Sequence, residues 1–235
     1  MGDEVYGMDM LPRTAACAEY AVIDQKRIAR KPRNLSHAEA AAVPLAGLTA
    51  YQALKMGRVG PATRVLIIGA SGGVGTFAVQ IARTLGAKVT GVCSGKNADL
   101  VKSLGADETI DYTKHDFIND HADYDLVFDV TSYQSLATCS SLLRSGGMYI
   151  TAIGNLKNVR EYLRDNLTKR GQRAGAVVVS SNTRDLEALT TLFEEGRIKP
   201  IIQEEFPLER IDEAFALSRT GRSVGKIVIS VKGDL

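Results

Sequence analysis

The chain has 235 residues, 45% of them hydrophobic and 24% charged, as expected of a globular protein that buries a substantial core. The formal net charge of +2 gives no electrostatic basis for binding nucleic acid or an acidic membrane surface. The three cysteines have no CxxC spacing, and we find neither a signal-peptide pattern nor an apolar run of bilayer length. We therefore expect a cytoplasmic protein with reduced thiols.

The N-terminal region predicts short strands followed by a capped helix. Residues 2–7 (GDEVYG) and 18–23 (AEYAVI) are strand-like pieces separated by loop residues. The basic run at residues 25–33 has no aromatic residues among it and no second basic cluster, so it indicates a solvated strand edge and turn rather than a nucleic-acid site. Ser36 with Glu39 three positions later is a capping-box pattern, which predicts a helix over 36–42.

Residues 64–82, RVLIIGASGGVGTFAVQIA, predict a buried strand, a glycine-rich turn and an amphipathic helix in succession. Such a turn directs free backbone N–H groups and a helix dipole at one point, which suits a pyrophosphate. Ala70 stands where the strict dinucleotide pattern has glycine. A purely structural turn, in which the glycines serve only tight packing, is the alternative. The glycines of the turn are Gly69, Gly72, Gly73 and Gly75.

After the turn, strands and helices alternate, which predicts an α/β fold with a doubly wound parallel sheet. The expected strands are 88–93, 108–111, 125–130, 148–153 and 176–180, and the expected helices are 97–104, 136–143 and 184–195. Gly146 and Gly147 indicate a turn. Strands at 201–206 and 226–231 flank a helix at 208–217, so we expect a second, β-rich part built from both termini.

The residues after the second strand of the sheet point to the type of dinucleotide. NAD-selective proteins place a carboxylate there to bind the ribose 2′-OH, and residues 93–97 (CSGKN) contain none. Ser94 and Lys96 instead offer a hydroxyl and a positive charge, which suit the 2′-phosphate of NADPH. A turn closed by Ser94 with a merely solvated Lys96 is the alternative.

Eight segments in order along the chain resemble a known family. They are GDEVYG (2–7), AEYAVI (18–23), AEAAAVPLAGLTAYQAL (38–54), GASGGVG (69–75), LGADETIDY (104–112), LVFDV (126–130), EEGRIKPII (194–202) and GRSVGKIVI (221–229). The chain resembles the zinc-independent medium-chain dehydrogenase/reductases, close to the NADPH:quinone oxidoreductases. The resemblance implies a Rossmann domain over 49–195, with 1–48 and 196–235 forming part of a GroES-like catalytic domain.

The resemblance also implies roles for individual residues. Ser71, Gly73 and Val74 would place backbone groups on the pyrophosphate, and Ser94, Lys96 and Tyr112 would surround the 2′-phosphate. Gly72, Gly75 and Asn97 are also expected to bind the cofactor. Thr49, Ile153 and Gly154 would lie near the nicotinamide and its ribose, and Lys226 near the phosphates. A packed aromatic ring at Tyr112 and a surface charge at Lys226 are the alternatives.

The resemblance implies hydride transfer from NADPH to a quinone or an α,β-unsaturated carbonyl without a metal. The only histidines, His37, His115 and His121, are not paired with a cysteine at the spacing of zinc ligands. The proton would come from water or a hydroxyl. Tyr51 is a candidate donor, although core packing explains that residue equally well.

In the family, the GDEVYG segment lies well inside the catalytic domain, whereas here it directly follows Met1. We therefore expect the N-terminal part of that domain to be missing, which leaves a non-catalytic NADPH-binding module or subunit as the alternative function. The resemblance further implies a homodimer that pairs through strand 148–153, and a small-molecule substrate as the other partner.

Overall fold

The computed structural model describes residues 2–9, 16–152 and 171–231. The chain divides into two compact units. One unit is the continuous stretch Thr49–Val178, and the other combines Met1–Leu48 with Val179–Leu235. The unit made of two segments includes α7 (Thr183–Glu194), although this helix falls within the range 49–195 expected for the cofactor domain.

The continuous unit is built on a six-stranded, wholly parallel sheet, which confirms the predicted α/β fold. Its strand order is β5-β4-β3-β6-β7-β8, so the chain moves outward from β3 in one direction and then, from β6, in the other. The strands are β3 (Arg64–Ile68), β4 (Lys88–Cys93), β5 (Glu108–Asp111), β6 (Tyr124–Asp129), β7 (Leu143–Ala152) and β8 (Arg173–Val177).

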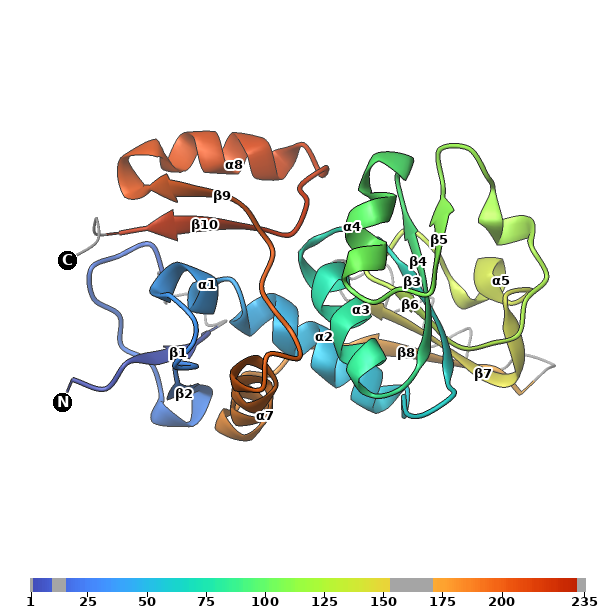
Figure 1. Ribbon diagram of the computed structural model, residues 1–235, viewed down its shortest axis with the longest axis horizontal. Coiled ribbons are helices and arrows are strands. Elements are labelled where there is room, and N and C mark those ends of the chain that lie inside the picture. The colour runs from blue at the N-terminus through green and yellow to red at the C-terminus, as the bar shows by residue number, and fades with distance from the viewer. Residues whose placement is uncertain (1, 10–15, 153–170, 232–235) are drawn as a thin grey trace. The chain divides into compact units, whose positions relative to one another are not determined.

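Both faces of this sheet are covered. Residues 65–68 of β3 are all buried although successive side chains of a strand point to opposite faces. The helices α3 (Gly73–Thr84) and α4 (Ala98–Ser103) pack on β3, β4 and β5 (Figure 1). The end of α2 (Pro44–Met56) meets β6 where Gly57 contacts Leu126, and α5 (Leu136–Cys139) packs against β7.

The region around β7 differs from the sequence-based prediction. The expected helix 136–143 is only the four-residue α5, and Gly146 and Gly147 lie inside β7 instead of forming a separate turn. The pairing of β7 with β6 shifts register between Tyr124 and Leu126, and a Cβ on Gly147 would lie 3.0 Å from the Tyr124 carbonyl oxygen. The glycine therefore permits a close approach of two strands in an irregular ladder.

The strand expected at the edge of the sheet is an interior strand. β7 pairs with β6 on one side and with β8 on the other, so the predicted pairing of two copies through residues 148–153 is wrong as stated. Among the described residues, the edges of the sheet are β5 and β8.

The other unit contains two small sheets and the α-helices α1, α7 and α8 among its described residues. β1 (Val5–Gly7) pairs antiparallel with β2 (Ile28–Arg30), and β9 (Ile202–Pro207) pairs parallel with β10 (Lys226–Ser230). Helix α8 (Ile211–Arg219) runs along β9 and β10 (Figure 1). Helix α1 (His37–Ala41) begins at the predicted capping box, in which Ser36 and Glu39 bond reciprocally.

Residues 18–23 do not form the predicted strand. They have extended or irregular backbone without a ladder partner in the described chain, and most of their side chains are exposed. The segment contains residues that favour strands, but a strand also needs a neighbour to accept its backbone hydrogen bonds. The strand edge and turn indicated by the basic run are confirmed by β2 and the short 3-10 helix Gln25–Arg27 before it.

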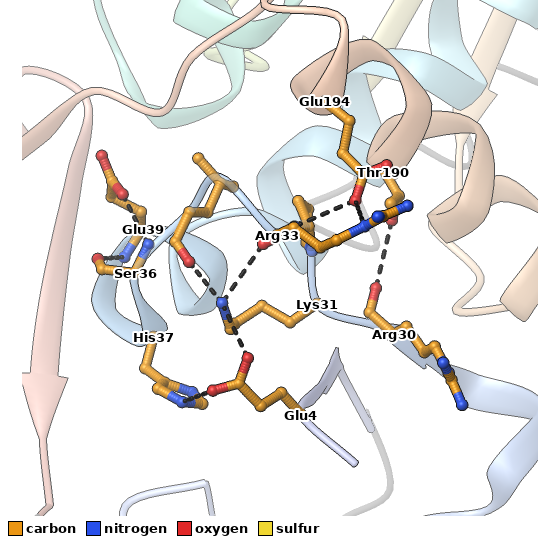
Figure 2. Close-up of polar contacts among 11 residues, drawn as sticks. Glu4, Arg30, Lys31, Arg33, Ser36, His37, Glu39, Thr190 and Glu194 are labelled. Carbon is orange, nitrogen blue, oxygen red and sulfur yellow. Dashed lines mark hydrogen bonds and ion pairs between the residues drawn. The ribbon is translucent and has the colours of Figure 1, made fainter. Parts of the chain in front are cut away.

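A cluster of polar contacts joins β1, β2 and α1 (Figure 2). Lys31 is buried, and its Nζ donates to the carbonyl oxygens of Pro32 and Leu35 and lies 3.4 Å from Glu4 Oε2. His37 Nε2 lies 3.1 Å from the other Glu4 oxygen. Hydrogen bonding and charge from Lys31, followed by those from His37, lower the pKa of Glu4. The cluster therefore stabilises an ionised Glu4.

Candidate functional site

The strand order identifies one place on the sheet as the candidate site. β3 and β6 are neighbours, yet the segments that follow them lead in opposite directions across the sheet. In open parallel sheets, ligands bind outside the carboxyl ends of strands at such a switch point. Residues 69–72 and 130–135 follow β3 and β6 at this edge.

The glycine-rich turn offers unpaired backbone donors at this edge. The N–H groups of Gly69 and Ala70 donate to the Val92 carbonyl at 3.1 and 3.0 Å, and no side chain caps α3 at Gly72. In the described chain, no acceptor is found for the N–H groups of Ser71 and of the first helical residues, Gly73 and Val74. These half-exposed donors at the positive end of a helix form a cradle that fits a pyrophosphate.

Two glycines of the turn serve different purposes. A Cβ on Gly75 would overlap the Gly69 carbonyl oxygen and the Ala70 backbone, so glycine is needed there for close packing of helix and strand. A Cβ on Gly72 would meet only Gly69 O, at an ordinary 3.5 Å. Gly69 itself has a φ of 83°, which favours glycine.

The turn is linked to the segment after β4. Asn97 Nδ2 donates to Ser71 Oγ at 3.0 Å, which brings together two residues expected to bind the cofactor. Ser94 begins the short 3-10 helix Gly95–Asn97, on which Lys96 is exposed. Tyr112 follows the neighbouring strand, donates its N–H to the Cys93 carbonyl at 3.3 Å and keeps 58% of its surface exposed. A hydroxyl, a cation and an exposed aromatic ring thus follow the adjacent carboxyl ends of β4 and β5.

The prediction overlooked a carboxylate at this position. Asp111 pairs with Cys93 in the parallel ladder, and a Cβ on Gly95 would overlap its Oδ2. Hydrogen bonds from the Thr113 hydroxyl and N–H, with smaller contributions from the Gly95 backbone and from the charge of Lys114, lower the pKa of Asp111 against the effect of burial. Aligning the ends of the two predicted strands would have placed this residue beside the 93–97 turn.

A second carboxylate, Asp129 at the end of β6, is also new from the structure. It is fully buried and accepts five hydrogen bonds. Its Oδ1 accepts from the N–H and hydroxyl of Thr131 and the N–H of Ser132, and its Oδ2 from the N–H of Gln134 and the hydroxyl of Tyr149. The sequence shows the residue within LVFDV but not its partners, which come from a loop and another strand.

The remaining expected residues lie on other elements. Thr49 and Tyr51 are on α2, where Thr49 is buried and the Tyr51 ring lies 5.8 Å from Lys55 Nζ. Lys226 begins β10 in the other unit, and burial lowers the pKa of its half-buried ammonium group. Ile153 and Gly154 lie outside the described residues.

The described part of the chain contains no group of three or more His, Cys, Asp or Glu side chains arranged to hold a metal ion. Likewise, no helix in that part of the chain is sufficiently long and apolar to span a bilayer.

Comparison with known proteins gives consistent matches. A zinc-binding dehydrogenase family model matches residues 104–229. The chain is 35% identical to 2-methylene-furan-3-one reductase of Solanum lycopersicum and 32% identical to the chloroplastic NADPH-dependent alkenal/one oxidoreductase of Arabidopsis thaliana, with 97% of this chain aligned to each. The quinone oxidoreductase structure from Coxiella burnetii superposes with a TM-score of 0.90 at 30% identity and covers 99% of this chain.

The chain is shorter than these proteins. It spans 57% and 58% of the two plant reductases and 73% of the Coxiella burnetii chain. The family match covers more than half of this chain's residues. The chain belongs to the zinc-binding dehydrogenase family of the medium-chain dehydrogenase/reductase superfamily.

Proposed function

We propose that the protein is an NADPH-dependent reductase that transfers hydride to a quinone or an α,β-unsaturated carbonyl without a metal. The observation that carries the proposal is the cradle formed by the N–H groups of Ser71, Gly73 and Val74, which have no acceptor among the described residues and lie at the switch point of the sheet. The printed names of the relatives support the reaction class: one is an NADPH-dependent alkenal/one oxidoreductase and another a quinone oxidoreductase.

In this proposal the chain binds the cofactor in three parts. Gly72 and Gly75 shape the turn whose backbone binds the pyrophosphate, and the hydroxyl and cation of Ser94 and Lys96 bind the 2′-phosphate. Further proposed contacts are made by Asn97 and Tyr112 on the adenosine side, by Thr49, Ile153 and Gly154 near the nicotinamide, and by Lys226 near the phosphates.

The bound cofactor supplies the hydride, and the protein supplies position and a source of protons. A conjugated carbonyl accepts hydride at carbon and becomes an enolate, which then takes a proton. Tyr51 is the proposed donor from the chain, with water as the other source. Because the acceptor is already electron-poor, the proposal assigns no metal to the reaction.

The activity is tested by following absorbance of the reduced nicotinamide with a panel of quinones and enals. We expect NADPH to be consumed only when an acceptor is present. Tight NADPH binding without consumption across the panel would contradict the reductase and support the second candidate, a non-catalytic NADPH-binding module or subunit.

The cofactor preference is tested by Lys96→Glu. Reversing the charge beside the 2′-phosphate should weaken NADPH by at least about tenfold while leaving NADH within about twofold, as measured by titration of cofactor fluorescence. Lys102→Glu, an equal change of charge at an exposed position on α4, is the matched control. Equal weakening of NADPH and NADH by Lys96→Glu would rule out the phosphate contact.

We further propose a cytoplasmic homodimer. β8 is an edge strand of the large sheet in the described chain, and edge strands are the ones that can pair between copies. Sedimentation velocity should give the mass of two chains, and a monomer at all concentrations would refute the dimer.

A further inference from the structure

The turn after β6 is held in place by the Asp129 carboxylate. Of the five donors to this carboxylate, four belong to residues 131–134, the segment that immediately follows the strand. The fifth, the Tyr149 hydroxyl, lies 3.0 Å from Asp129 Oδ2 and 2.7 Å from the Gln134 carbonyl oxygen. Strand β7 is thereby tied to the same turn. A buried charge with this many donors fixes the conformation of the backbone around it.

The turn itself is strained. Ser132 has a φ of 59°, in the left-handed region that non-glycine residues seldom occupy. Its hydroxyl donates to the Ala152 carbonyl at the end of β7 and accepts from Thr151 Oγ1 at 3.0 Å. Strain of this kind persists only where surrounding contacts impose it. Here the contacts are the hydrogen bond from the Ser132 N–H to Asp129 and those of the Ser132 hydroxyl with β7.

The strained turn directly contacts the glycine-rich turn. A Cβ on Gly69 would lie 2.8 Å from Thr131 Cγ2, so the two turns touch across the switch point between β3 and β6. If the 2′-phosphate lies beyond β4 and the pyrophosphate beyond β3, the cofactor crosses the sheet edge in the order β4, β3, β6. Its nicotinamide half then lies at the turn that Asp129 holds.

We propose that Asp129 is a positioning residue for the nicotinamide half of the cofactor. It holds residues 131–134 beside the glycine-rich turn as a wall against which the nicotinamide half packs, and it does not itself touch the cofactor. The inference rests on the proposed function, because it takes NADPH as the ligand. Tyr149 and Ser132 support the same wall from β7 and from within the turn.

The test compares NADPH with adenosine 2′,5′-bisphosphate, which lacks the nicotinamide half. In Asp129→Asn the side-chain Oδ1 still accepts hydrogen bonds, but the new amide faces the Gln134 N–H and the Tyr149 hydroxyl. The Gln134 N–H then loses its acceptor, whereas the Tyr149 hydroxyl can still donate to the Gln134 carbonyl. We expect NADPH to bind about tenfold more weakly and the bisphosphate to bind unchanged, by calorimetric titration. A general loss of structure would weaken both ligands.

Asp125→Asn is the matched control. Asp125 belongs to the same strand near its other end, where it accepts the Arg64 N–H at 2.8 Å and pairs with Arg144. Its replacement should leave both affinities unchanged. Ser132→Ala is the second variant, in case the buried Asn prevents folding. It removes the hydroxyl anchor to Ala152, and we expect NADPH alone to weaken about fivefold.

The possible outcomes separate the two claims. Failure of the unaltered protein to bind NADPH overturns the cofactor assignment and the inference together. If the unaltered protein binds NADPH, then parallel loss of both ligands in the folded variants, or loss of neither, overturns the inference alone. Loss of NADPH binding with the bisphosphate retained supports it.

Discussion

Gly72 and Gly75 look equivalent in the sequence, yet the structure distinguishes them. A side chain at 75 has no room against the backbone of residues 69 and 70, whereas a methyl group at 72 makes an ordinary contact. Gly75→Ala should destabilise the protein by about 1–3 kcal/mol through overpacking. For a chain of this size the thermal midpoint should then fall by about 2–4 °C per kcal/mol.

Gly72→Ala is the internal comparison for that experiment. Since its φ of −81° suits alanine, its thermal midpoint should stay within about 1 °C of the unaltered protein. Equal midpoints for the two variants, measured by calorimetry, would refute the assigned packing role of Gly75.

The residues of the candidate site differ in how far the sequence could predict them. The glycine-rich turn is local, so its strand, turn and helix were predicted from spacing alone, and the structure confirms them. Asp111 and Asp129 depend on pairing between strands that are distant in sequence, and that pairing determines which groups face each carboxylate. The sequence alone does not show which strands pair, and therefore does not show which groups surround these two carboxylates.

At the scale of elements, the two strands that follow the glycine-rich turn were the most predictable. The bounds of β4 and β5 agree with the prediction, because the turns that flank each strand are local signals. Residues 18–23 and the segment from α5 into β7 were predicted wrongly. Residues 18–23 lack a neighbouring strand in the described chain, and the ladder between β6 and β7 is irregular at Gly147, so tertiary pairing outweighed the local pattern in both places.

The capping box of α1 should matter because the helix has only five residues. Ser36 Oγ accepts the Glu39 N–H at 3.1 Å, and Glu39 Oε2 accepts the Ser36 N–H at 2.8 Å. Ser36→Ala removes one of these bonds and should cost about 1 kcal/mol in free energy of unfolding, by urea denaturation.

Ser103→Ala provides the control for that cap. The Ser103 hydroxyl bonds to the Leu100 carbonyl in the last turn of α4, where alanine is an equally good or better helix former. We expect a change of less than about 0.5 kcal/mol. A similar loss in both serine variants would show that the cap contributes nothing particular.

For the whole molecule, stability should decline on both sides of neutral pH. The folded-state pKa values of Glu4 and Asp111 lie below the ordinary 4.5 and 3.8, so their stabilisation is present above those values and is lost as pH falls. Burial raises the pKa of Tyr6 and of Cys139 to about 12, and their contribution is lost as pH rises above the ordinary 10.0 and 9.0.

The thermal midpoint measured against pH should therefore be flat near neutrality and fall below about pH 4.5 and above about pH 9. Glu4→Gln should reduce the acid-side slope, since glutamine keeps the hydrogen bond from Lys31 without a proton to gain. A midpoint that rises as the pH is lowered from 5 to 3 would contradict the assignment.

The division of the chain into Thr49–Val178 and a unit made from both flanking segments has a consequence for synthesis on the ribosome. The central stretch is complete when residue 178 emerges, so its sheet can form while translation continues. Tyr6, in contrast, donates to the Leu186 carbonyl, 180 residues later, and β10 ends only at Ser230. The first 48 residues thus emerge long before their packing partners, and they are the segment on which we expect chaperones to act in the nascent chain.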